Sequence, residues 1–208
     1  MKQRKTRKEK TIETKKKIYE AADKLFRKYS FDKVTVDTIV ETAGVSKGAF
    51  YIYFESKDAL IANLIADTVN NVDLDYISYV QSFPVGTPAS DILISLAGKI
   101  ADVITNFIGY DAMKIIYEVQ ITKTVNTNAL LSYNRDVYKL FNEVITLGVQ
   151  QGEFNKKMPI DTIAKHFIIA LRGLTYEWCI RYPDFDLKFH VLEHFKILLT
   201  GIRRQENH

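Results

Sequence analysis

The segment that decides the fold is TVDTIVETAGVSKGAFYIYFES, which runs from Thr35 to Ser56. Thr35 is a favourable N-cap, and Gly44 follows the apolar residues of the first predicted helix, where a left-handed residue often ends a helix. Ser46 is a second N-cap, so two short helices are predicted on either side of a tight glycine turn. This arrangement is typical of a helix-turn-helix, whose second helix lies in the major groove of DNA.

Helical periodicity extends to both sides of this segment. Apolar residues recur at three- and four-residue steps over about 14–30, and another helix, capped by Ser56, is predicted from Asp58 to about Tyr79. Beyond the loop Ser82 to Ser90, helices are predicted over about 89–107, 111–123, 127–151, 160–182 and 187–203. The sequence therefore predicts an all-α protein, with a three-helix helix-turn-helix domain (residues 1–57) followed by a six-helix regulatory and dimerisation bundle (58–208).

The composition favours a compact protein in a reducing compartment. Of the 208 residues, 47% are hydrophobic, which supplies a substantial core. The single cysteine, Cys179, excludes an intramolecular disulfide and is interpreted as a buried structural thiol. No apolar run follows the basic N-terminus, and no segment reaches the ~18 apolar residues of a membrane span. We therefore expect a cytoplasmic protein without membrane contact.

Charge is distributed unevenly along the chain. Residues 1–60 hold 15 Lys and Arg against 9 Asp and Glu, whereas residues 61–208 hold 14 against 16. Such an asymmetry points to a polyanionic partner for the basic part, although a solvated basic tail would give the same count. Residues 1–11 are expected to be disordered, and we hypothesise that KQRKTRKEK (Lys2 to Lys10) adds contacts to phosphates or to the minor groove.

Two local features near the predicted turn are unfavourable for a helix and favourable for DNA binding. Lys47 and Lys57 each follow a capping serine, where a cation opposes the helix dipole. Gly48 costs up to about 1 kcal/mol relative to alanine in a helix interior, but it lets the backbone approach DNA closely. The hydroxyls of Tyr51 and Tyr53 suit phosphate oxygens, and Ala49 suits a thymine methyl group. A surface helix with core aromatics is the structural alternative.

The run VTVDTIVETAGVSKGAFYIYFESKDAL (Val34 to Leu60) closely resembles the DNA-binding signature of the tetracycline-repressor family, and the preceding AADKLF (Ala21 to Phe26) fits it too. The resemblance implies a DNA-binding regulator and not an enzyme. It places Lys47 and Gly48 as base readers, and it implies phosphate contacts by the following residues: Thr35, Ser46, Tyr51, Tyr53 and Lys57.

The resemblance also implies a homodimer formed by the last two helices and a small-molecule effector bound in the middle region. Both helices are apolar over a wide face, which is equally compatible with packing inside one domain. The candidate interface residues are Phe167, Leu171, Gly173, Leu174, Phe195, Leu198 and Leu199. The candidate pocket residues, each of which is also suited to a core, are Phe107, Tyr110, Met113, Tyr117, Gln120, Tyr133, Phe141 and Trp178.

Rival interpretations rest on weaker patterns. HVLEH (His190 to His194) matches a zinc-peptidase motif, but no third ligand is marked, so neither a metal nor a cofactor is predicted. The glycine loops and nucleophile motifs of common enzyme classes are absent from the sequence. The expected function is a homodimeric repressor that a small apolar or amphipathic ligand releases from a palindromic operator. A DNA-binding regulator controlled by a protein partner, or constitutive, remains the alternative.

Overall fold

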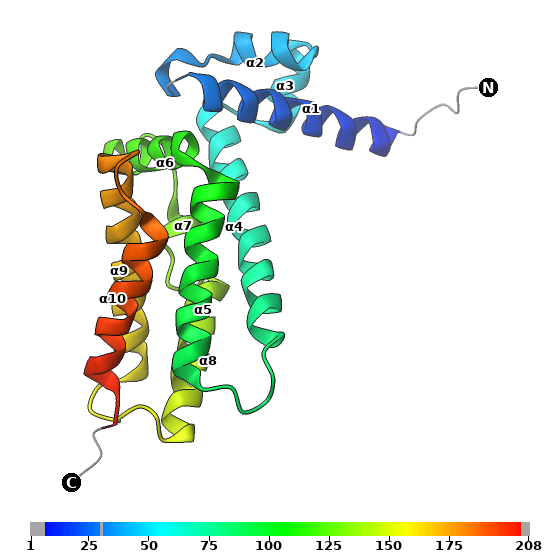
Figure 1. Cartoon of the computed structure of the whole chain (residues 1–208). Coiled ribbons are helices and arrows are strands. Elements are labelled where there is room, and N and C mark those ends of the chain that lie inside the picture. The colour runs from blue at the N-terminus through cyan, green and yellow to red at the C-terminus, as the bar shows by residue number, and fades with distance from the viewer. Residues whose placement is uncertain (1–6, 30, 205–208) are drawn as a thin grey trace. The chain divides into compact units, whose positions relative to one another are not determined.

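The computed structural model describes residues 7–29 and 31–204, whose regular secondary structure is helical, without an extended sheet (Figure 1). They form two compact units. Unit 1 comprises Met1–Asp67 and Asp111–Thr127, and unit 2 comprises Thr68–Tyr110 and Asn128–His208. Helix α4 (Lys57–Gln81) begins in unit 1 and continues into unit 2. These compact units do not coincide with the two domains predicted from the sequence, 1–57 and 58–208. The predicted boundary is a functional one and stays a prediction.

Unit 1 holds the predicted helix-turn-helix. Its elements are α1 (Arg7–Lys28), a short 3₁₀ turn η1 (Phe31–Lys33), α2 (Val36–Ala43), α3 (Lys47–Tyr53), the start of α4, and most of α6 (Tyr110–Thr122). Helices α1, α2 and α3 pack against one another. Their common core contains the fully buried Ile18, Ile39 and Phe50. This core fixes the position of α3 within the unit.

Helix α1 begins earlier than the sequence predicts. The N-terminal eleven residues were expected to be disordered, yet the helix starts at Arg7. Residues 1–6, which include part of the basic tail, lie outside the described residues. The residues before 14 are rich in lysine, arginine and glutamate, which are good helix formers. The helix is further supported by two ion pairs at four-residue spacing, Glu13 with Lys17 (3.5 Å) and Lys16 with Glu20 (3.7 Å).

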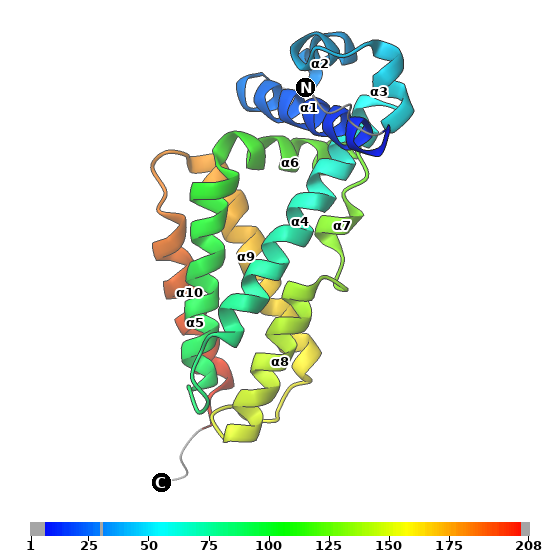
Figure 2. The ribbon, with the colours of Figure 1, turned by 90° about the vertical axis from the view of Figure 1, so that its right-hand side faces the viewer.

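Unit 2 is a helical bundle. Besides the second part of α4, it contains α5 (Ala89–Asp102), the π-helical segment η2 (Val103–Ile108), α7 (Asn128–Leu131), α8 (Asp136–Gln151), α9 (Ile160–Arg181) and α10 (Leu187–Ile202). Helix α5 packs on α8 and α10, and α9 packs on α8 and α10 (Figures 1 and 2). The centre is aromatic, with the rings of Phe141, Phe167 and Phe195 between 4.8 and 6.1 Å apart.

Two boundaries in unit 2 differ from the sequence prediction. The helix expected over 89–107 becomes π-helical in its last turn, where the Gly109 amide donates to the Ile104 carbonyl at 2.9 Å. The helix expected over 127–151 is broken between α7 and α8. At this break the Ser132 side chain accepts from the Asn134 amide at 3.0 Å. Such a local side-chain bond offers the backbone an alternative to helix.

The same break places an arginine beside a buried acid. Arg135, directly before α8, donates to Asp73 of α4 through Nη2 (2.6 Å) and Nε (3.2 Å). Only 5% of the Asp73 side chain and 16% of the Arg135 side chain are exposed. The guanidinium also donates to the Leu130 carbonyl at 3.3 Å, so it ties α7, α8 and α4 together within unit 2.

Candidate nucleic-acid interface

Three helices of unit 1 begin at side-chain caps, as the sequence predicts. The Thr35 hydroxyl oxygen accepts from the Thr38 amide at 3.2 Å, and the Thr38 side chain accepts from the Thr35 amide at 3.0 Å. Ser46 accepts from the Ala49 amide at 3.1 Å, and Ser56 caps α4. Gly44 ends α2 in the left-handed conformation with φ 64°. The cap hydroxyls of the serines each keep a hydrogen that can be donated to a phosphate oxygen.

Helix α3 has one buried and one exposed side. Phe50 is fully buried and Phe54 is 2% exposed, with their rings 5.6 Å apart. On the other side Tyr51 is 49% exposed, and its ring packs edge-on against Phe50. Ile52 is 76% exposed. The buried pair therefore anchors the helix, while its outer residues are available to a partner.

The glycine in α3 is not required by packing. A Cβ built at Gly48 would meet only the Ser46 hydroxyl, at 3.9 Å. Its backbone does not adopt a positive φ, since the described glycines with positive φ are Gly44, Gly86, Gly109 and Gly152. The protein's own fold thus gives no reason for glycine at this exposed position, which agrees with an approach of the backbone to DNA.

Gly48→Ala is therefore expected to separate stability from DNA binding. Alanine should raise the free energy of unfolding by about 0.5–1 kcal/mol, because it loses less backbone entropy in a helix. Affinity for the operator should fall, because the methyl group holds the backbone away from DNA. Urea unfolding and fluorescence anisotropy measure the two effects. Gly201→Ala, in α10 with nothing within 4 Å of a Cβ, is the control that should leave DNA affinity unchanged.

The two lysines that follow capping serines have partners inside unit 1. The Lys47 ammonium lies 2.8 Å from a carboxylate oxygen of Asp37 in the first turn of α2, and this hydrogen bond raises the pKa of Lys47. The Lys57 ammonium donates to the Phe31 carbonyl at 2.9 Å and lies 3.9 Å from the centre of the Phe31 ring. Lys57 thus holds η1 against the start of α4, and its contact with phosphate stays a prediction.

Residues 18–64 match the family described as "Bacterial regulatory proteins, tetR family". Over these residues the chain carries the DNA-binding segment of the tetR family. The match covers α1 from Ile18, the whole helix-turn-helix and the first turns of α4, which is the part of unit 1 in which the caps and the exposed α3 side lie.

Relatives extend the similarity beyond this segment. The transcriptional regulator AcrR of Shigella flexneri is 26% identical and spans 94% of this chain and 92% of its own length. An uncharacterised regulator of Bacillus subtilis, YfiR, is 28% identical over 76% of each chain. FadR from Bacillus subtilis, solved in complex with stearoyl-CoA, shares the fold with a TM-score of 0.73 at 16% identity, over 90% of this chain and 98% of its own. The chain is thus a DNA-binding transcriptional regulator, as the names of these relatives describe them.

The pocket residues that the sequence predicts for this regulator fall into both units. Met113, Tyr117 and Gln120 belong to unit 1, and the other five belong to unit 2. Phe141 is part of the aromatic centre of the bundle and is fully buried. Trp178 packs edge-on against Tyr110 at 6.0 Å. Tyr110 and Trp178 thus belong to one aromatic cluster of unit 2. The pocket as a whole stays a prediction.

The predicted interface residues also divide, by burial. Phe167, Leu171, Phe195 and Leu199 are at most 6% exposed, so they belong to the core of unit 2 and offer no surface to a partner. Gly173 is exposed, and Leu174 and Leu198 are half-buried. The large apolar residues that the two helices do expose are Ile169, Tyr176 and Ile180 of α9, and Phe189 and Ile197 of α10. Both helices thus expose apolar residues, but four of the seven predicted interface residues lie on their buried sides, and the interface itself stays a prediction.

The histidine pair and the cysteine lie in α9 and α10. His190 stacks on Phe185 at 4.2 Å, and no group of three or more metal-binding side chains occurs among residues 7–29 and 31–204. Burial raises the pKa of the Cys179 thiol to about 11, so it is protonated at neutral pH. No single described helix is long and apolar enough to cross a membrane, although the bent pair Ala89–Ile108 and Tyr110–Thr122 meets the test of length and composition.

Proposed function

We propose that this tetR-family protein is a homodimeric cytoplasmic repressor that binds a palindromic operator and releases it when a small apolar or amphipathic ligand binds. The observation that carries the proposal is the exposed side of α3. It presents a lysine at a capped helix start, a glycine that packing does not require and a half-exposed tyrosine. A helix N-terminus with these groups suits base edges and phosphates.

Different roles are proposed for the residues of this surface. Lys47 and Gly48 read bases, and Ala49 contacts a thymine methyl group. Phosphate contacts are assigned to Thr35, Ser46, Tyr51, Tyr53 and Lys57. All eight lie in or directly before α2, α3 and α4 of unit 1.

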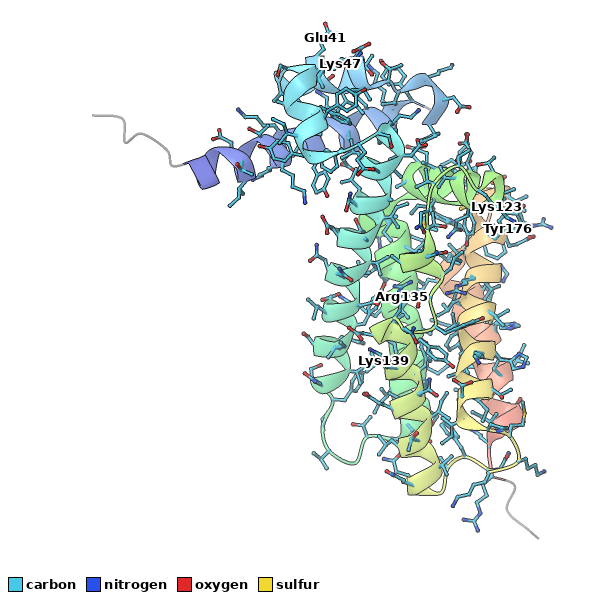
Figure 3. The ribbon with its side chains drawn as sticks, turned by 180° about the vertical axis from the view of Figure 1, so that it is seen from behind. Glu41, Lys47, Lys123, Arg135, Lys139 and Tyr176 are labelled. Atoms are coloured by element: carbon cyan, nitrogen blue, oxygen red, sulfur yellow. The ribbon has the colours of Figure 1, made fainter. Side chains whose placement is uncertain are left out.

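The exposed apolar surface of α9 and α10 supports the homodimer. Ile169, Tyr176 and Ile180 follow one another at intervals of seven and four residues, so they lie on one side of α9, and Figure 3 labels Tyr176 at that surface. Gly173 continues the same side and has nothing within 4 Å of a Cβ, which leaves room for a close helix. Contiguous exposed apolar residues mark interaction sites on soluble proteins. A second copy of the chain would place two reading helices about one turn (~34 Å) of DNA apart.

The proposal for the ligand is supported by two neighbours of the same fold. FadR from Bacillus subtilis was solved with stearoyl-CoA and FadR from Thermus thermophilus with lauroyl-CoA, the latter with a TM-score of 0.68. Both ligands are amphipathic, as proposed here. Release follows from reciprocal coupling: a ligand that binds best to a conformation unsuited to DNA is itself bound less tightly when DNA is present.

The test begins with selection of bound sequences from a random duplex library at a stated salt concentration. Enrichment of a palindrome is expected. Lauroyl-CoA and stearoyl-CoA are then added to the operator complex, and release at micromolar concentration is expected. Enrichment without palindromic symmetry would contradict the dimer. Operator binding that neither ligand changes, together with an unshifted melting temperature, would favour the alternative of a regulator under a protein partner or without an effector.

Substitution of the two lysines separates base reading from phosphate contact. Lys47→Ala is expected to reduce affinity for the operator and to relax selection at one base-pair position, with a loss of about 1–3 kcal/mol. Lys57→Ala is expected to weaken binding to all duplexes alike and to lower the salt slope by about 0.9, because one phosphate contact is lost. Titrations of operator and random duplex at four salt concentrations measure both. Equal effects of the two variants on both duplexes would contradict the assigned roles.

A further inference from the structure

An acidic residue lies at the surface that is proposed to read DNA. The Asp37 carboxylate is 2.8 Å from the Lys47 ammonium, and the pair joins the first turn of α2 to the first residue of α3 (Figure 3 labels Lys47). The side chain of Asp37 is 71% exposed and that of Lys47 is 54% exposed. Both charges therefore face solvent in the DNA-free protein.

Stability does not account for this pair. An ion pair between two exposed side chains contributes little, because water screens the charges and both side chains lose freedom. For binding to DNA in general the carboxylate is unfavourable, because it repels phosphates over a screening length of about 8 Å at physiological salt. Asp37 also partly cancels the lysine charge that would attract them. A surface selected only for affinity would have no use for an acid at this position.

The chemistry of the ammonium group suggests what the acid does. A free lysine has a flexible stem and three N–H donors, so it can contact any phosphate within reach. When one donor is engaged by Asp37, the direction of the ammonium is restricted and two donors remain. Two donors match the two acceptors, O6 and N7, that guanine presents in the major groove.

We propose that Asp37 is a positioning residue that sets sequence selectivity: its carboxylate directs Lys47 toward a guanine edge and withdraws it from phosphates. The inference rests on the proposed function, since it requires α3 to read an operator. Asp37 is thus a determinant of the ratio between operator binding and random binding.

Asp37→Asn is the direct test, because asparagine has the same shape and no charge. Its affinity for random duplex is expected to rise about threefold, and the salt slope to steepen by about 0.9, as Lys47 gains a phosphate contact. The ratio of operator to random affinity is expected to fall about tenfold, the size of one base contact. Asp37→Glu keeps the carboxylate and is expected to retain most of the wild-type ratio.

Two controls separate positioning from a merely structural role. Glu41→Gln removes the same charge one helical turn further along α2, and it should change operator and random affinity alike. In a Lys47→Gln background, Asp37→Asn should alter the ratio by less than twofold, because the residue it directs is gone. A structural role, such as the favourable position of an acid in the first turn of α2, would lower the melting temperature and persist in that background.

The outcomes distinguish the inference from the proposed function. If wild-type protein enriches no operator, the proposed function fails. If an operator is enriched but Asp37→Asn leaves the affinity ratio within twofold of wild type, the inference alone is wrong. An equal change of the ratio with and without Lys47 would also overturn it.

Discussion

Replacement of Arg135 by methionine is expected to lower the free energy of unfolding of unit 2 by about 3–5 kcal/mol, because the partner acid stays buried without its counter-charge. The Asp73 side chain is 5% exposed, and both of its oxygens accept from the guanidinium. Trp178 is the only tryptophan of the chain and is 4% exposed within unit 2. Its fluorescence during urea unfolding therefore reports the loss directly.

Two further variants show whether the effect comes from the unpaired acid. Asp73→Leu combined with Arg135→Met should recover most of the loss, because a buried ion pair can be replaced by apolar residues at little cost. Lys139→Met breaks the exposed pair with Asp136 and should change stability by less than about 1 kcal/mol. A loss below 1 kcal/mol in Arg135→Met would mean that water reaches Asp73 and that the pair does not hold the helices together.

Phe50→Ala is expected to abolish operator binding although it alters no exposed residue of α3. The side chain is fully buried and packs against the rings of Phe54 and Tyr51. Loss of such a core phenylalanine costs about 3–5 kcal/mol, which is a large part of the stability of a small unit. Far-UV circular dichroism should show early loss of part of the helix, whereas Trp178 fluorescence should keep its wild-type transition.

Ile52→Ala, two residues along the same helix, is the matched control. Its side chain is 76% exposed, so stability should stay within about 0.5 kcal/mol of wild type. Operator affinity of Phe50→Ala within threefold of wild type would show that α3 keeps its place without the aromatic anchor.

The helix-turn-helix is predictable from sequence because its signals are local. Thr35 and Ser46 cap helices within three residues of their own position, and Gly44 takes the left-handed conformation that ends α2. Helical spacing alone places Phe50 and Phe54 on the same, inward side of α3. None of these features depends on a distant part of the chain.

The break before α8 was missed because it depends on a distant residue. Periodicity over 127–151 indicates one helix, whereas Arg135 leaves the helical conformation and binds Asp73, 62 residues earlier. The sequence does not separate the buried from the exposed apolar residues of α9 and α10 for a related reason. A wide apolar face does not reveal which of its residues the bundle covers, and α9 and α10 bury Phe167 and Phe195 while they expose Ile180 and Ile197.

In the candidate site, too, the sequence does not reveal contacts between residues that are distant along the chain. The sequence alone indicates that the cation at the start of α3 faces DNA. The structure adds a counter-charge that belongs to the protein itself, the exposed carboxylate of Asp37 at 2.8 Å from the Lys47 ammonium. Sequence spacing places Asp37 on α2 but gives no distance between two helices. The sequence likewise predicts a phosphate contact for Lys57 and does not reveal its hydrogen bond to the Phe31 carbonyl.

In the seven residues of α3, different positions serve folding and DNA contact, which affects how such regulators can change their operator sequence. Phe50, with Phe54 beyond the helix end, carries the attachment to the rest of unit 1, while Gly48 and Ile52 contribute almost nothing to it. Mutations at these outer positions are therefore expected to change the free energy of unfolding only slightly. A duplicated gene can drift toward a new operator through viable intermediates, because no step on that path requires the helix to be rebuilt.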